Sequence, residues 1–420
     1  MPAAHHERLE ASIRRQLRRD AADLVAFAAE LIRIPSENPP GNVYRRCAKL
    51  IASRLRELGL ETRTVDPTGE GPCVLGTFGK GKPAFYLSGH YDVVPAQHRS
   101  QFAPLVRNGW LHGRGAADMK GGIAAMAFAI RALARSGFVP KGRIVSVSVP
   151  DEETSGPRGT VALAEAGLIE RDAAGMLTME PTGGVVWNAS RGAISLRVTL
   201  RGRPAHVGLH FRGVNAFRGM LDVAREFTRL EARVSRRLTK HRVGSAAARR
   251  SILLLGGELS GGHNFNVVPD RASFTVDRRT NPEEGLEAER ESLLATIDRA
   301  RRRGHEIDVE VLQEARASAT STGHPLARAL AACIRDVTGR AARFELCPGV
   351  LETRHYAALG IPALAFGPGE LSRSHGPNEA VSVRGLVQAA EIAALTALRL
   401  LAANDAGAGR NRPRRPLPKR

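Results

Sequence analysis

Five short stretches rich in His, Asp or Glu constrain the fold of this chain, because each follows an apolar run or lies in a glycine-bearing loop. They are residues 88–92, 113–120, 150–154, 179–182 and 374–379. In an open α/β sheet, ligands bind just beyond the carboxyl ends of the strands. A fold that brings these stretches to one such edge would gather imidazoles and carboxylates, which are groups that zinc binds.

Strands and helices alternate along the first part of the chain. Apolar runs indicate strands at 84–87, 144–149 and 176–179, and helical spacing indicates helices at 21–32, 43–58, 121–134 and 160–166. This alternation predicts a mainly parallel α/β sheet with helices on both faces. The first of these strands leads straight into His90, as expected for a residue at the carboxyl end of a strand.

The pattern changes near Arg191. Alternating apolar and polar residues indicate strands with one solvated face at 194–200, 272–276 and 307–312, separated by helices at 215–230 and 282–303. A helix at 325–338 and a strand at 362–366 then restore the first pattern. We therefore expect a catalytic α/β domain in two segments (1–190 and 314–402), an inserted α+β lid or dimerisation domain (191–313), and a disordered basic tail (403–420).

Composition favours an ordinary globular enzyme. The 420 residues carry a formal net charge of +20, but the surplus is mostly Arg, is spread along the chain and comes with only 5% aromatic residues. A nucleic-acid partner is therefore disfavoured, although a basic surface could steer an anionic small molecule. Four scattered cysteines, no apolar N-terminal signal segment and no membrane-spanning run favour a cytoplasmic enzyme with reduced thiols and no membrane contact.

Each acidic or His-bearing stretch also has a purely structural interpretation. His90 and Asp92 could form a structural pair, Asp118 could cap the helix that follows it, and the three acids at 151–153 could form a solvated loop. A metal site explains all five stretches together better than five separate structural roles. In that interpretation Asp92 orients the His90 ring through its distal nitrogen.

In the metal-site interpretation, the acids at 151–153 have different roles. Glu153 binds a metal ion, while Glu152 points to the open face as a general base. Glu180 follows an apolar strand, and His375 lies in a Gly/Pro/Ser loop where a structural His would have little to pack against.

In order along the chain, the motifs resemble those of the dizinc aminoacylase/carboxypeptidase family, which includes acetylornithine deacetylase and succinyl-diaminopimelate desuccinylase. The motifs are Gly-His-x-Asp-Val-Val-Pro at 89–95, Gly-Arg-Gly-x-x-Asp-Met-Lys at 113–120, Asp-Glu-Glu at 151–153, Glu-Pro-Thr at 180–182 and Ser-His-Gly-Pro-Asn-Glu at 374–379. The resemblance covers residues 24–401.

The resemblance implies a centre of two zinc ions per chain, in which Co²⁺ or Mn²⁺ could replace zinc. One ion would be held by His90, Asp118 and Glu180. The other would be held by Asp118, Glu153 and His375. Asp118 would thus bridge the ions, and Glu152 would be the base and proton shuttle.

The inserted domain shares the resemblance. It implies that His206 stabilises the oxyanion in the active site of a partner subunit, so that the chain forms a homodimer. Asn266 would face the substrate, and Arg279 would bind a substrate carboxylate with its forked guanidinium. The chain departs from the family pattern at Glu352, which replaces an Asp two residues before Arg354. We expect both residues near the substrate, and the departure leaves the acyl or side-chain specificity open.

These features predict a metal-dependent hydrolase that cleaves the amide bond of N-acyl amino acids through a metal-bridged water. A dipeptidase or carboxypeptidase is the alternative, because it would use the same catalytic residues on a small peptide. A basic, non-catalytic binding module is a remote alternative, supported only by the net charge.

Overall fold

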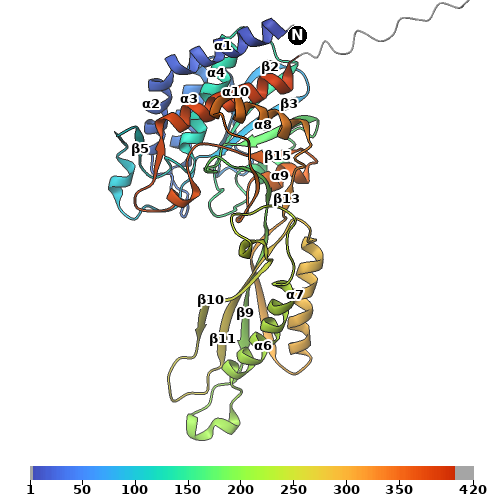
Figure 1. The fold of residues 1–420 in the computed structure, drawn as a ribbon. Coiled ribbons are helices and arrows are strands. Elements are labelled where there is room, and N and C mark those ends of the chain that lie inside the picture. The colour runs from blue at the N-terminus through green and yellow to red at the C-terminus, as the bar shows by residue number, and fades with distance from the viewer. Residues whose placement is uncertain (1–2, 403–420) are drawn as a thin grey trace, which may run out of the picture. The chain divides into compact units, whose positions relative to one another are not determined.

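The computed structural model describes residues 3–402, which form two compact units. Unit 1 is built from Met1–Gly184, Pro325–Ala342 and Phe366–Arg420, and unit 2 from Val185–His324 and Arg343–Ala365. The expected fold class is confirmed: unit 1 has a mixed sheet with parallel central strands and helices, and unit 2 has an α+β arrangement (Figure 1). The tail expected at 403–420 lies outside the described residues. No helix within 3–402 is long and apolar enough to cross a membrane.

The sheet of unit 1 gathers strand ends where the acidic stretches begin. Its strands follow the order β1-β2-β6-β3-β7, with bounds Glu61–Val65, Cys73–Lys80, Gly142–Val149, Ala84–His90 and Ala173–Thr178. β3 pairs in parallel with both β6 and β7, so the carboxyl ends of these three strands meet at one edge. β2 and β1 extend the sheet antiparallel. Every residue of β3 is buried, which accounts for its continuous apolar run.

The helices of unit 1 are α1 (Ala3–Arg19), α2 (Ala21–Ile32), α3 (Tyr44–Glu57), α4 (Lys120–Arg135), α5 (Thr160–Glu165), α8 (Pro325–Thr338) and α10 (Val383–Leu401). α4 contacts β3 and β6, and α10 contacts α4, β6 and β7. Ala and Gly side chains let α4 approach its neighbours closely, so nearly all of its residues are buried. The start of α4 fixes the position of Asp118, two residues before it.

A small antiparallel sheet brings the last of the five stretches to the second. It consists of β4 (Leu105–Arg107), β5 (Trp110–His112) and β16 (Ala380–Ser382), with β5 in the middle. His112 pairs with Ala380, and the Gly113 N–H donates to the Glu379 carbonyl oxygen at 3.0 Å. The loop at 374–379 is thereby held beside the loop at 113–118.

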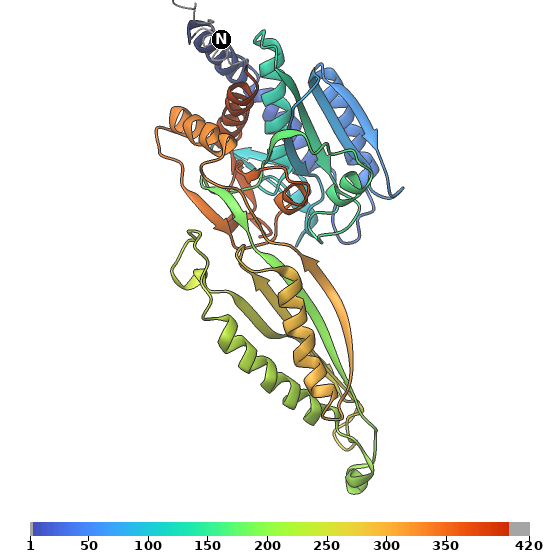
Figure 2. The same cartoon turned by 90° about the vertical axis from the view of Figure 1, so that its right-hand side faces the viewer.

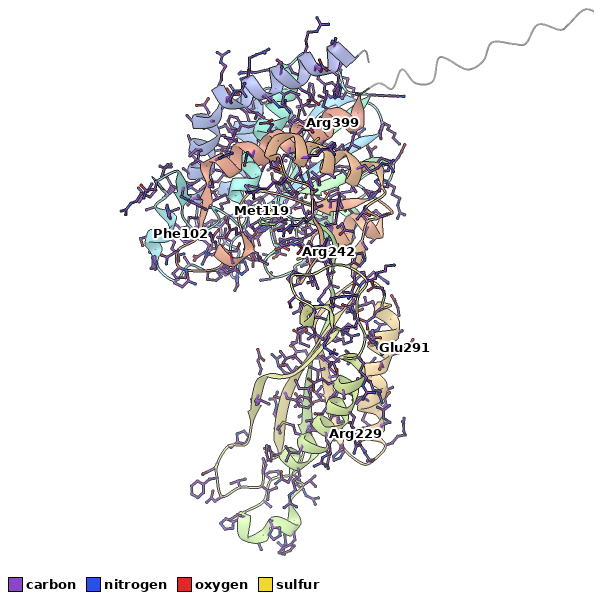
Figure 3. The ribbon with its side chains drawn as sticks, viewed as in Figure 1. Phe102, Met119, Arg229, Arg242, Glu291 and Arg399 are labelled. Atoms are coloured by element: carbon purple, nitrogen blue, oxygen red, sulfur yellow. The ribbon has the colours of Figure 1, made fainter. Side chains whose placement is uncertain are left out.

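Unit 2 contains a four-stranded antiparallel sheet of order β10-β11-β9-β12, with bounds Ile252–Gly261, Arg271–Thr280, Gly192–Arg201 and Glu306–Ala315. Two helices, α6 (Ala216–Val234) and α7 (Leu286–Arg301), pack side by side on it (Figure 2). Apolar residues such as Leu196, Phe227 and Phe274 fill the core between helices and sheet. The opposite helix faces are charged: Arg229 on α6 and Glu291 on α7 are exposed (Figure 3).

The rest of unit 2 is a second set of short strands. β8 (Val186–Ser190) pairs with β13 (Ser318–Ala319), β14 (Phe344–Cys347) and β15 (Ala363–Ala365), and α9 (Thr353–Ala358) contacts β13 and β15.

Candidate metal centre

His90 ends β3 with its imidazole held on both sides. Its Nε2 lies 3.1 Å from Asp118 Oδ1, while its Nδ1 lies 3.1 Å from the Asp92 carbonyl oxygen and 3.4 Å from Asp92 Oδ1. Asp92 is fully buried and also accepts hydrogen bonds from the backbone N–H groups of Glu152 (3.2 Å) and Glu153 (3.1 Å). Asp92 therefore orients the imidazole and anchors the acidic loop.

Asp118 lies between two imidazoles. Its Oδ1 faces His90, and its Oδ2 lies 3.3 Å from His375 Nε2. The helix-capping interpretation of Asp118 is wrong, because the N-cap residue of α4 is Met119, which is fully buried. The carboxylate is thus free to bridge two cations.

Glu379 and Arg114 hold the backbone around Asp118. Glu379 Oε1 accepts hydrogen bonds from the backbone N–H groups of Ala117 and Asp118, each at 3.0 Å. Its other oxygen pairs with Arg114 at 2.5 Å, and both side chains are almost fully buried. Both residues lie within the motifs at 113–120 and 374–379, but no role was predicted for either.

The acidic loop turns sharply after β6. Asp151 has a φ of 71°, and the Gly156 N–H closes the turn on the Asp151 carbonyl oxygen at 2.9 Å. A Cβ on Gly156 would lie 1.9 Å from Asp151 Oδ2, so this close approach requires glycine. Arg158 Nη2 pairs with Asp151 Oδ1 at 2.7 Å. Asp151 thus stabilises the loop itself, and the two acids that follow it, Glu152 and Glu153, lie near the imidazoles of His90 and His375.

Glu152 and Glu153 take different positions. Glu153 Oε2 lies 3.2 Å from His375 Nε2, and its side chain is 5% exposed. Glu152 Oε2 lies 3.8 Å from His90 Nε2, with a side chain 14% exposed. Glu152 therefore stands beside the cluster without belonging to either group of ligand-type atoms described next.

Two groups of ligand-type atoms share Asp118. His90, Asp118 and Glu180 form one, and Asp118, Glu153 and His375 form the other, with the atoms of each group within 4.8 Å of one another. Glu180 follows β7, is 5% exposed, and its Oε1 has no hydrogen-bond partner among the described residues. A buried carboxylate oxygen without a donor is costly, and a bound cation would relieve that cost. The donor set of imidazole and carboxylate suits zinc, so the residues fit two metal ions.

The raised pKa values of Glu180, His375 and His90 agree with a site that needs added positive charge. Burial raises the pKa of Glu180 well above its usual value, and the neighbouring Asp118 adds to the effect. Hydrogen bonds to Asp118 and Glu153 raise the pKa of His375 to about 10. Burial disfavours charge on His90, yet hydrogen bonds to Asp118 and Asp92 raise its pKa well above its usual value. Protons thus neutralise a cluster in which bound cations would displace them.

The predicted substrate residues of the inserted domain belong to unit 2. His206 is exposed, and its Nδ1 accepts a hydrogen bond from the Gly208 N–H at 3.1 Å. Asn266 is half-buried, and its Oδ1 has no hydrogen-bond partner among the described residues. Arg279, on β11, is paired with Asp277 at 2.9 Å, and Ser195 in turn donates to Asp277.

Glu352 and Arg354 flank the start of α9 and are both buried. Glu352 Oε1 lies 3.7 Å from His355 Nε2. Arg354 Nη1 has no hydrogen-bond partner among the described residues, which leaves this buried guanidinium with an unused donor.

The chain belongs to peptidase family M20/M25/M40, whose sequence profile matches residues 86–399. It is 29% identical over 336 residues to succinyl-diaminopimelate desuccinylase from Alkalilimnicola ehrlichii, covering 77% of this chain and 85% of that protein. It is 31% identical to a probable succinyl-diaminopimelate desuccinylase from Staphylococcus aureus, but that match covers only 50% of this chain and 57% of the relative.

Solved structures share the fold. An M20 family metallo-carboxypeptidase from Sulfolobus solfataricus superposes with a TM-score of 0.76 at 17% identity, covering 90% of this chain and 99% of that one. A dipeptidase from Saccharomyces cerevisiae gives a TM-score of 0.73 at 18% identity, covering 93% and 98%. The match to the family profile confirms the family suspected from the motifs.

Proposed function

We propose that this chain is a hydrolase that uses two zinc ions to cleave the amide bond of N-acyl amino acids. The observation that carries the proposal is the Asp118 carboxylate, whose two oxygens face different imidazoles, with Glu152 beside it. The two desuccinylase relatives support an acyl group on an amino acid as the substrate class. Co²⁺ or Mn²⁺ would suit the same ligands.

The bound metal ions would polarise the amide carbonyl and lower the pKa of a water molecule. Glu152 takes a proton from that water as it attacks the carbonyl carbon, and then passes the proton to the leaving amine. Asp92 keeps the His90 ring in one orientation throughout, because it contacts the ring nitrogen that faces away from Asp118. His206 of a partner subunit stabilises the oxyanion, which makes the working form a homodimer.

Substrate recognition is assigned to unit 2. Arg279 binds the substrate carboxylate, with Asp277 holding the guanidinium in place. Asn266 and Arg354 offer unused polar atoms that suit an acyl or amino-acid group. Glu352 adds a longer acid than the family pattern has, and so bears on which acyl group is accepted.

Amine release from a substrate panel tests the function. The panel contains acetylornithine, succinyl-diaminopimelate, other N-acyl amino acids and simple dipeptides, with Zn²⁺ or Co²⁺ added and Glu152→Gln as the blank. We expect one N-acyl amino acid to be strongly preferred and its cleavage to stop on chelation. Preference for a dipeptide would indicate a peptidase instead. No release from any substrate, with both ions bound, would contradict the hydrolase proposal.

A further inference from the structure

The loop that joins α2 to α3 lies against the residues that follow β3. The Asn38 N–H donates to the Val93 carbonyl oxygen at 2.8 Å, and the Val93 N–H donates to the Ser36 carbonyl oxygen at 3.0 Å. Asn38 is only 3% exposed. These hydrogen bonds fix the Asn38 backbone, and the burial of Asn38 directs its side chain into the protein interior.

That side chain ends among acceptors from two other segments. Asn38 Nδ2 lies 2.9 Å from Asp92 Oδ2, 3.1 Å from Asp151 Oδ1 and 3.0 Å from Thr154 Oγ1. The buried carboxylates of Asp92 and Asp151, which both lie within hydrogen-bond distance of the same amide nitrogen, repel each other unless donors lie between them. The neutral amide supplies such donors without adding a charge of its own.

Both of these carboxylates control the backbone that carries Glu152. Asp92 accepts the Glu152 and Glu153 N–H groups on one side. Asp151 is the residue before Glu152 and is clamped by Arg158, whose guanidinium lies 5.3 Å from the centre of the Tyr44 ring. The chain of contacts therefore runs from Tyr44 through Arg158 and Asp151 to Asn38, and from there to Asp92.

We propose that Asn38 is a positioning residue for the general base: its amide joins Asp92 to Asp151 and so fixes the turn from which Glu152 projects. Its role in turnover rests on the proposed function of Glu152, whereas its effect on the turn does not. Asn38 touches neither group of metal-ligand atoms directly, but the turn also carries Glu153. Loss of Asn38 should therefore displace the base while the group of His90, Asp118 and Glu180, which takes no residue from the turn, stays intact.

The main test replaces Asn38 with Asp, which has the same shape but puts a third carboxylate where a donor stood. We expect kcat to fall about 10- to 100-fold with KM within about twofold, because a base displaced by a fraction of an ångström loses its alignment. At least one metal ion per chain should stay bound, because the group of His90, Asp118 and Glu180 takes no residue from the turn. Asn42→Asp is the matched control, since Asn42 lies in the same loop, is exposed, and undergoes the same change of charge. It should keep its kcat.

A second variant tests the contact itself. Asn38→Ala removes the donor without adding a charge, so it should lower kcat less than Asn38→Asp does, again with little change in KM. A kcat of Asn38→Ala equal to that of the unaltered protein, or a loss of metal in Asn38→Asp that matches its loss of kcat, would contradict a positioning role.

Hydrogen exchange provides a readout that does not depend on turnover. In Asn38→Ala, backbone N–H groups of 151–156 should exchange faster than in the unaltered protein, while those of 113–118 should not change. Unchanged exchange in 151–156 would overturn the proposal even if activity falls. An unaltered protein without metal-dependent turnover would overturn the proposed function, while the exchange result would still decide the role of Asn38.

Discussion

Two aspartates near His90 carry out different tasks because their surroundings differ. Asp118 faces two imidazoles, and although burial would raise its pKa, hydrogen bonds from His375 and His90 lower it overall. Asp92 instead receives backbone N–H groups and the Asn38 amide, so its charge is used to hold other residues. The Asp118 carboxylate can therefore bind cations, whereas the Asp92 carboxylate is engaged in hydrogen bonds within the protein.

Replacing Glu152 with Gln should separate proton transfer from metal binding. The variant keeps the shape of the side chain but cannot take up a proton, so we expect kcat to fall by roughly 10³-fold, within the range for a lost general base. Metal analysis of the purified protein should still show the same metal content, because Glu152 belongs to neither ligand group. More than a few per cent of the original activity would remove Glu152 from the role of base.

The motifs were enough to predict which residues form the candidate site, but not which residues hold them in place. His90, Asp118, Glu153, Glu180 and His375 were selected from motifs, and the structure brings them into two groups; their roles as ligands stay predictions. The pairing of Arg114 with Glu379 was not foreseen, because a contact between such distant positions depends on β5 and β16 lying together. Asn38 lies outside the five motifs, and its contacts with Asp92 and Asp151 join segments that are far apart in the sequence.

At the scale of elements, helices with a broad apolar face were predictable and helix α1 was not. α2 and α8 have the bounds that apolar spacing predicted, and α4 differs by one residue at each end. α1 lies in a polar, basic segment whose buried apolar residues, Leu9, Ile13 and Leu17, form one narrow line. That line is stabilised by contacts with α4 and α10, which are far away in the sequence.

The charge cluster near the start of α7, in which Arg278 pairs with Glu284 and Glu289, should make the stability of the protein depend on pH. Burial alone would raise the pKa of Glu284, but hydrogen bonds from Ser251 and the Asn281 backbone, together with Arg278, lower it overall. A depressed pKa stabilises the fold above the unfolded value of about 4.3. That contribution disappears as the pH falls through the lower, folded value.

Glu284→Gln should therefore lower the free energy of unfolding by about 2 kcal/mol at pH 7, as expected for lost charged hydrogen bonds in a buried setting. The gap between variant and original should narrow below about pH 4. Urea unfolding of the full chain across this pH range measures it. Glu287→Gln is the control, since its pair with Arg316 is exposed, and it should change stability little. A gap that widens in acid would contradict the assignment.

At the scale of the whole molecule, the proposed homodimer makes a quantitative prediction. Glu152→Gln and His206→Ala should each be nearly inactive alone, because one lacks the base and the other the donated imidazole. Mixed and re-assembled, random pairing gives half mixed dimers, each with one intact site, so about a quarter of the original activity should return. No recovery, despite subunit exchange shown by co-purification of differently tagged variants, would place His206 outside the neighbouring site.

The order of the chain adds a consequence for how the protein is made. His90, Asp118, Glu153 and Glu180 all precede unit 2, whereas His375 follows both of its segments. A ribosome therefore completes one ligand group long before it supplies the last member of the other. A nascent or truncated chain that stops before His375 would be equipped for a single ion, so the second would be acquired only after both segments of unit 2 have been made.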